Sequence, residues 1–232
     1  MRITSFPPGA PPPERAPWVC IRRYGNEKAV GSAIAKSGIA RDKLFVSSKV
    51  YPTGGYDSTL AAFDDSLSRL GLDYLDLYII HWPAGGPEKR KESWRAMEEL
   101  LAAKRVRAIG VSNYLQQHIQ EILDDPSLEH APHINQCELH PQCQWQELRA
   151  FCSANGVQFM GYMPFGGQGA PLLRDRGILA AANMTAKSTG RPVTAAQLLV
   201  HFVHSPQSKT TFNYRDVEFS IVLLEFQSQI FD

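Results

Sequence analysis

The sequence predicts an α/β fold with a parallel sheet, and within that class it favours a (β/α) barrel of the TIM type. Short apolar or β-branched runs alternate with amphipathic stretches at a period of roughly 25 to 32 residues, which is typical of consecutive βαβ units. No GxGxxG or GxxxxGK[ST] motif follows a strand, which argues against the rival, a doubly wound open sheet. Polar residues end the strands, as they do at the active rim of a parallel barrel.

From about residue 19 the elements follow one another in a regular order. The predicted strands are 44–49, 76–82, 108–113, 133–139 and 157–164. The predicted helices between and after them are 26–37, 58–71, 92–105, 114–125 and 146–156. We expect three regions: an irregular Pro-rich lead-in over 1–18, a barrel domain over 19–204 and a divergent tail over 205–232.

Helix 58–71 illustrates how the helices are predicted. Leu60, Phe63, Leu67 and Leu70 form one apolar stripe at helical spacing. Ser58 is expected to cap the start of this helix, and the glycine at position 71 its end.

Composition limits the function further. The 232 residues include 24 Lys and Arg against 23 Asp and Glu, and this net charge of +1 argues against a nucleic-acid binder. No apolar run reaches the roughly 18 residues of a membrane-spanning helix, and no signal peptide is recognisable, so we expect a protein of the cell interior. Cys20, Cys137, Cys143 and Cys152 lack CxxC spacing and are expected to be reduced thiols.

Two ionisable residues end neighbouring predicted strands. Each has a simpler interpretation: a snorkelling strand end or a salt bridge for Lys49, and a hydrogen-bonded core imidazole for His81. Together on one rim they favour a functional site. A lysine held beside a tyrosine lowers the pKa of the phenol, which can then pass a proton at neutral pH. The pairs His130 and His133, and His201 and His204, lack a third ligand at useful spacing, so no metal site is expected.

Several longer motifs resemble the aldo-keto reductase family over residues 22–204. They are RVRAIGVSNY (105–114), LGLDYLDLYIIHWP (70–83), GYDSTLAAFDDSL (55–67), INQCELHP (134–141) and GYMPFG (161–166). The resemblance implies a (β/α)8 barrel that reduces aldehydes and ketones to alcohols with NADPH. It also implies a cytoplasmic monomer whose partner is a small-molecule aldehyde or ketone, with no nucleic acid and no membrane involved.

The resemblance also implies roles for three residues of the reaction. Tyr24 matches the family's proton donor, Lys49 the lysine that depresses the pKa of that tyrosine, and His81 the histidine that orients the substrate carbonyl. Trp82 would line the substrate pocket.

Further residues match the cofactor site of the family. Ser112, Asn113 and Gln136 match the groups that hydrogen-bond the nicotinamide carboxamide, and Tyr162 matches the ring that stacks on the nicotinamide. Phe165 and Gly166 match the loop that approaches the pyrophosphate. Simpler roles remain open: Ser112 and Asn113 could cap the following helix, Gln136 could be a buried amide, and Tyr162 could belong to the core.

The chain departs from the family pattern in three places. Val19 stands where the family has the aspartate that pairs with the lysine. The family's first strand is not visible, although residues 2–6 could be a remnant of it. The tail 205–232 shares nothing with the eighth strand and its cofactor-binding cations. We therefore expect an incomplete barrel, apparently truncated at both ends, in which 219–226 substitutes for a missing strand.

These departures leave two alternatives to a working reductase. One is a catalytically impaired or inactive relative that acts as a binding protein. The other is a fragment with no independent function.

Overall fold

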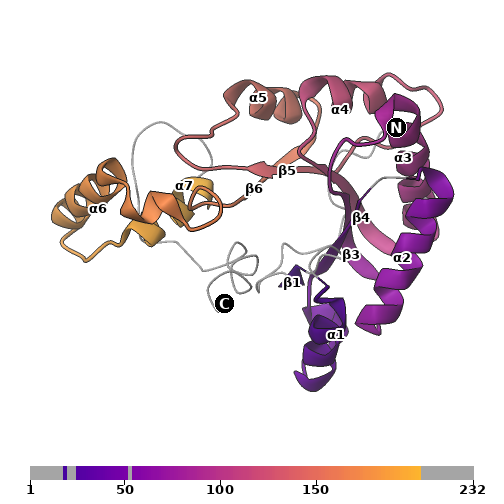
Figure 1. Cartoon of the computed structure of the whole chain (residues 1–232), viewed down its shortest axis with the longest axis horizontal. Helices are drawn as coiled ribbons and strands as arrows, with labels where there is room; N and C mark the ends of the chain where they lie inside the picture. The colour runs from indigo at the N-terminus through magenta and orange to yellow at the C-terminus, as the bar shows by residue number, and fades with distance from the viewer. Residues whose placement is uncertain (1–17, 20–24, 52–53, 205–232) are drawn as a thin grey trace. The chain divides into compact units, whose positions relative to one another are not determined.

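The computed structural model describes residues 18–19, 25–51 and 54–204, and its strands and helices alternate along the chain (Figure 1). The strands are β1 (Trp18–Val19), β2 (Val46–Val50), β3 (Leu75–Ile80), β4 (Val106–Ser112), β5 (Ile134–Glu138) and β6 (Gln158–Tyr162). The α-helices are α1 (Glu27–Lys36), α2 (Tyr56–Leu70), α3 (Gly86–Ala102), α4 (Gln116–Leu123), α5 (Gln146–Ala154), α6 (Arg176–Thr189) and α7 (Ala195–His204). The 3-10 helices are η2 (Arg41–Lys43) and η3 (Pro171–Arg174).

The described strands form one sheet whose order, β1-β2-β3-β4-β5-β6, is the order of the strands along the chain. The neighbours from β1 to β5 pair in parallel. The predicted parallel α/β architecture is thus confirmed. A doubly wound sheet reverses its strand order at a switch point, whereas a barrel does not. The sequential order therefore supports the barrel. The predicted remnant 2–6 and substitute strand 219–226 lie outside the described residues.

The described residues divide into two compact units: those up to 137 together with 146–160, and 138–145 together with 161–204. In the first unit, helices α1 to α5 follow one another along the same side of the sheet (Figure 1). Val46, Tyr78 and Val111 on that face pack with helix residues such as Phe63 and Trp94. This helix-facing layer is the main hydrophobic core.

The other face of the sheet carries a smaller apolar cluster. Its buried members are Leu77, Ile79, Ala108 and Ile134, and Phe45 and Met160 pack against them. Because side chains alternate along a strand, residues offset by two from these members share their face. We call this the inner face, and it determines where the site residues lie.

In the second unit, Phe165, Leu172 and Leu199 form a separate core. They come from the loop after β6, from η3 and from α7. The sequence analysis did not predict helix α6. The Asp175 side chain caps this helix by accepting a hydrogen bond from the Ile178 N–H at 3.0 Å. Within the described part of the chain, no helix has the length and apolar character that crossing a membrane requires.

Several predicted helix boundaries differ from the structure by two to six residues, and two of the helix starts show the reason. Helix α2 begins at Tyr56 after Gly55, whose φ is 79°, so Ser58 lies inside the helix and does not cap it. Helix α3 begins at Gly86, six residues before the predicted start, because Pro87 fits the first turn, where no backbone N–H is needed. The predicted end of α2 is confirmed, since Gly71 adopts the left-handed conformation, with φ at 65°.

Candidate active site

Polar side chains lie at the carboxyl ends of neighbouring strands in the first unit. Lys49 in β2 is buried, and its backbone is in register with Ile79 of the inner face. Ser112 in β4 and Gln136 in β5 follow the inner-face residues Ala108 and Ile134 at even spacing. Alternation therefore puts the three side chains on the inner face, at one edge of the sheet. The structure thus brings these predicted residues to a common edge.

His81 follows β3 at the same edge. Its N–H donates to the Val50 carbonyl at 2.9 Å, which continues the pairing of β3 with β2 beyond Lys49. The imidazole lies near two exposed rings: Tyr51 is edge-on with its centroid 6.2 Å away, and the centroid of Trp82 is 6.4 Å away. An imidazole close to exposed aromatic rings is suited to contact a small organic ligand.

Tyr51 was not singled out in the sequence. Its position, two residues after Lys49, is the signal that could have found it, because that spacing repeats the face of a strand.

Hydrogen bonds from Ser112 and Asn113 fix the turn after β4. The Ser112 Oγ and the Asn113 N–H both donate to the Gln136 carbonyl, at 2.8 and 2.9 Å. The Asn113 Nδ2 donates to the His81 carbonyl at 3.1 Å and to the Ser112 Oγ at 3.0 Å. Three consecutive strand ends are thereby tied together. Neither residue caps α4, whose N-cap is Leu115, so the simpler role of helix capping is excluded.

The Gln136 side chain is buried and only partly satisfied. Its Nε2 donates to the Met160 Sδ at 3.1 Å, whereas its Oε1 has no hydrogen-bond partner among the described residues. A buried acceptor without a donor costs about 1–3 kcal/mol. The amide N–H of a nicotinamide carboxamide would supply the missing donor, so the residues present fit that group.

Asn135 is a supporting residue that the sequence reasoning missed. It is fully buried, its Nδ2 donates to the Tyr114 carbonyl at 2.8 Å, and its Oδ1 accepts from the Tyr114 N–H at 3.4 Å. Asn135 therefore holds the chain just after Asn113. Burial raises the pKa of Tyr114 far above its ordinary value, so this phenol stays neutral and is no candidate for proton transfer.

A buried carboxylate joins α1 to β2. The Ser48 Oγ donates to the Glu27 Oε1 at 2.9 Å, on the face opposite Lys49. Tyr24, three residues before Glu27, lies outside the described residues, so the structure does not test its convergence with Lys49 and His81. Val19 is described only by its backbone, which pairs in register with Ser47.

The remaining predicted residues belong to the second unit. Tyr162 ends β6, and its carbonyl accepts the Leu139 N–H at 2.9 Å. Phe165 is buried in the core of this unit. Gly166 has a φ of 84°, and a Cβ there would lie 2.8 Å from the Leu172 Cγ, so the position requires glycine.

Residues 22–208 match the sequence model of the aldo/keto reductase family. The chain belongs to this family, whose members generally use a nicotinamide cofactor.

Among curated proteins it is 49% identical over 142 residues to glyoxal reductase from Bacillus subtilis, covering 61% of this chain and 50% of that protein. It is 39% identical over 187 residues to 9,11-endoperoxide prostaglandin H2 reductase from Trypanosoma cruzi, covering 80% and 65%.

Similar solved structures are also aldo-keto reductases. An aldo/keto reductase from Brucella melitensis is 38% identical with a TM-score of 0.70, covering 79% of this chain and 66% of that one. An aldo-keto reductase enzyme from a Medee basin deep-sea metagenome library is 34% identical with a TM-score of 0.73, covering 83% and 68%. These matches confirm the (β/α)8 class of the fold. The chain spans about half the length of two Bacillus subtilis relatives, 50% of glyoxal reductase and 51% of the uncharacterized oxidoreductase YtbE.

Proposed function

We propose that the chain is an NADPH-dependent oxidoreductase that reduces a small aldehyde or ketone to an alcohol, acting as a monomer in the cytoplasm. The observation that carries this proposal is the inner-face edge, where Lys49, Ser112 and Gln136 end neighbouring strands beside His81. The unsatisfied Gln136 Oε1 adds a recognition group for an amide.

The residues that match the family's cofactor site would hold the cofactor. Ser112, Asn113 and Gln136 offer hydroxyl and amide groups to the nicotinamide carboxamide, the last with its free acceptor. Tyr162 would stack on the nicotinamide ring, and the backbone around Phe165 and Gly166 would approach the pyrophosphate. When bound, the reduced nicotinamide supplies a hydride to the carbonyl carbon.

The chain's own residues would handle the proton. The Tyr24 hydroxyl would give its proton to the carbonyl oxygen as the hydride arrives at the carbon. The Lys49 ammonium would stabilise the phenolate until it regains a proton from water. His81 would orient the carbonyl, and the exposed Trp82 and Tyr51 rings would enclose the rest of a small substrate.

One observation favours a second candidate, a protein that binds the cofactor without turnover. Val19 stands where the family pattern has an aspartate beside the lysine. A valine side chain carries no charge, so it cannot take the part of that carboxylate in the proton transfer that the family pattern supports.

The test uses the full chain, NADPH titrations followed by tryptophan fluorescence, and turnover of glyoxal followed by the absorbance of the reduced nicotinamide. Tyr24→Phe should lower kcat by about 10²–10⁴-fold and leave the Kd for NADPH unchanged. Gln136→Leu should weaken NADPH about tenfold, a loss of about 1.4 kcal/mol. Gln142→Leu, at an exposed glutamine, is the matched control.

The outcomes separate the candidates. Turnover that Val19→Asp raises supports the reductase, and binding without turnover supports the second candidate. A Tyr24→Phe chain as active as the original would refute the assigned proton donor. A chain that binds neither NADPH nor NADH would refute both proposals, and tighter binding of NADH would refute the preference for NADPH.

A further inference from the structure

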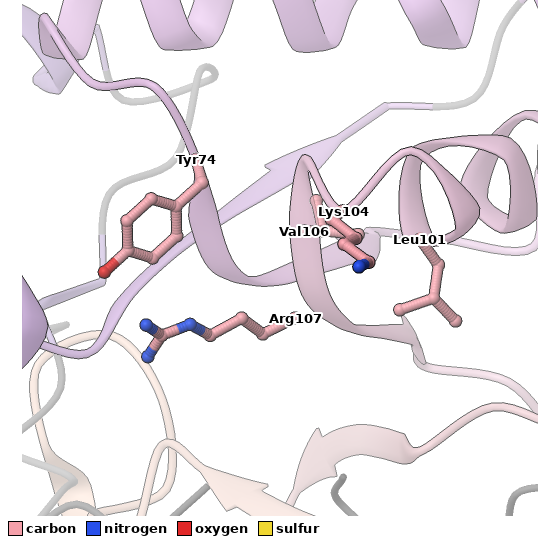
Figure 2. Close-up of a pocket in the computed structure, with 5 residues that line it drawn as sticks. All are labelled: Tyr74, Leu101, Lys104, Val106 and Arg107. Carbon is pink, nitrogen blue, oxygen red and sulfur yellow. The ribbon is translucent and has the colours of Figure 1, made fainter.

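A pocket of about 440 Å³ lies at the opposite edge of the sheet in the first unit, where β3 and β4 begin. Its lining residues are Tyr74, Leu101, Lys104, Val106 and Arg107; Figure 2 shows Tyr74 and the Arg107 guanidinium on one side and Lys104 and Leu101 on the other. Six residues of β3 at about 3.3 Å each put this edge roughly 20 Å from His81. The pocket, which we call the Tyr74 pocket, is thus separate from the candidate active site.

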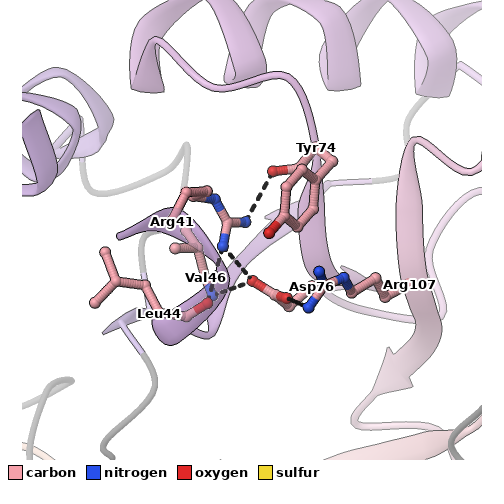
Figure 3. Close-up of polar contacts among 6 residues, drawn as sticks. All are labelled: Arg41, Leu44, Val46, Tyr74, Asp76 and Arg107. Carbon is pink, nitrogen blue, oxygen red and sulfur yellow. Dashed lines mark hydrogen bonds and ion pairs between the residues drawn. The ribbon is translucent and has the colours of Figure 1, made fainter. Parts of the chain in front are cut away.

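The charge around the Tyr74 pocket is positive. The Asp76 carboxylate is shared between two guanidiniums, with Arg41 Nη1 at 2.8 Å and Arg107 Nη1 at 3.0 Å (Figure 3). Both guanidiniums also contact the Tyr74 ring: the Cζ atom of Arg41 lies 3.9 Å from the ring centroid, and that of Arg107 lies 4.6 Å from it. One carboxylate against two cations leaves an excess positive charge, to which Lys104 adds another. The ammonium of Lys104 makes no ion pair with any residue that the structure describes.

The backbone of Lys104 is the second observation. It has a φ of 58° directly after α3 and its C-cap Ala103, a left-handed position where glycine is favoured. Its N–H donates to the Leu101 carbonyl at 3.0 Å, so this turn closes the helix. A cation here also suits the helix dipole. A residue other than glycine is uncommon in this conformation, and here it brings an ammonium to the lining of the Tyr74 pocket.

We propose that the Tyr74 pocket binds a small amphipathic organic anion. Lys104 and Arg107 take its carboxylate, sulfonate or phosphate, and Leu101, Val106 and the Tyr74 ring contact its apolar body. The volume is in the range of small-ligand sites, and apolar walls with a few charged groups are typical of such sites. Asp76 holds Arg107 in place through their ion pair. No carboxylate among the described residues pairs with Lys104, so its ammonium can bind the anion of the ligand.

The probe is anilinonaphthalene sulfonate, an apolar ring system with one anion, titrated into the full chain and followed by its fluorescence. Excess NADP⁺ is present, so that probe bound at the proposed cofactor site is displaced. Lys104→Gln and Lys104→Gly should each weaken the remaining binding about tenfold. Lys187→Gln, at an exposed lysine of α6, should leave it unchanged.

Lys104→Gly guards against a trivial loss of binding. Glycine fits the left-handed turn, so the melting temperature of this variant should stay the same or rise while the probe is lost. Probe affinity unchanged in both Lys104 variants overturns the proposal, as does complete displacement of the probe by NADP⁺. Inorganic phosphate competing as well as naphthalene sulfonate would overturn the ligand class, since the apolar walls would then contribute nothing.

Discussion

Replacing Asp76 by asparagine or alanine tests how one buried carboxylate joins three strands (Figure 3). Its Oδ2 accepts the Val46 N–H of β2 at 2.8 Å and pairs with Arg41 at 2.8 Å, and its Oδ1 pairs with Arg107 at the start of β4 at 3.0 Å. The Asp76 side chain is 1% exposed and that of Arg41 20%, so solvent screens their pair weakly. The Arg107 side chain is 46% exposed, so its pair adds little.

The expected loss in the free energy of unfolding follows from the burial of the Asp76–Arg41 pair. Alanine leaves the Arg41 guanidinium without its counterion and the Val46 N–H without an acceptor, and breaking such a buried pair costs about 3–5 kcal/mol. Asparagine keeps one acceptor oxygen and loses the charge, so its cost should be smaller, about 2 kcal/mol. The matched control is Asp64→Asn. Its pair with Arg105 is as short, 2.7 Å, but the two side chains are 60% and 40% exposed, so the expected loss is about 0–1 kcal/mol.

The assay is urea unfolding followed by tryptophan fluorescence, with the free energy of unfolding taken by linear extrapolation. Trp94, which is fully buried in the first unit, reports on the unit that holds Asp76. Equal losses for Asp76→Asn and Asp64→Asn would refute the reasoning, because burial would then make no difference to the two ion pairs.

Two further perturbations probe the same unit. Burial lowers the pKa of His133, so below its ordinary value of about 6.5 the unfolded chain takes up a proton that the folded chain resists. The stabilising contribution of neutral His133 is therefore present above that value and is lost as the pH falls towards the lower folded pKa. His133→Asn should flatten the fall in melting temperature between about pH 7 and pH 5. An equally steep fall in the variant would count against this role of His133. Gly31→Ala should cost about 1–3 kcal/mol, because the new Cβ would press on the backbone carbonyl of Leu70 and push α1 from α2. Thermal unfolding measures this loss, Ser32→Ala on the exposed side of α1 is the control, and equal melting temperatures for the two variants would contradict the close helix contact.

Local pattern alone gave the order of strands and helices, because backbone preference and apolar periodicity act over a few residues. It also located Gly71 at the end of α2, where a left-handed residue was required. It failed where two local signals competed. Ser58 is a good capping residue, but the helix begins before it at Tyr56, and Pro87 looks like a break although it suits a first turn.

Spacing also put Lys49, Ser112 and Gln136 at strand ends, and the period of two put them on one face. The hydrogen-bond partners of such side chains depend on tertiary contacts, which a local sequence pattern does not reveal. The Gln136 amide meets Met160, 24 residues further along the chain, and keeps its acceptor unsatisfied. Only the folded structure shows that the Gln136 Oε1 is the atom of the amide left without a hydrogen-bond partner among the described residues.

The sequence by itself thus determined the α/β class, the sequential strand order and the family motifs, all of which depend on short-range patterns of apolar and polar residues. The tertiary structure decided the partners of the charged groups. Asp76 looks like one acid in an apolar run, yet it joins Val46 and Arg107, 30 and 31 residues away. Such pairs depend on which strands become neighbours, and the burial that gives them their energy exists only once the sheet and its helices have packed together.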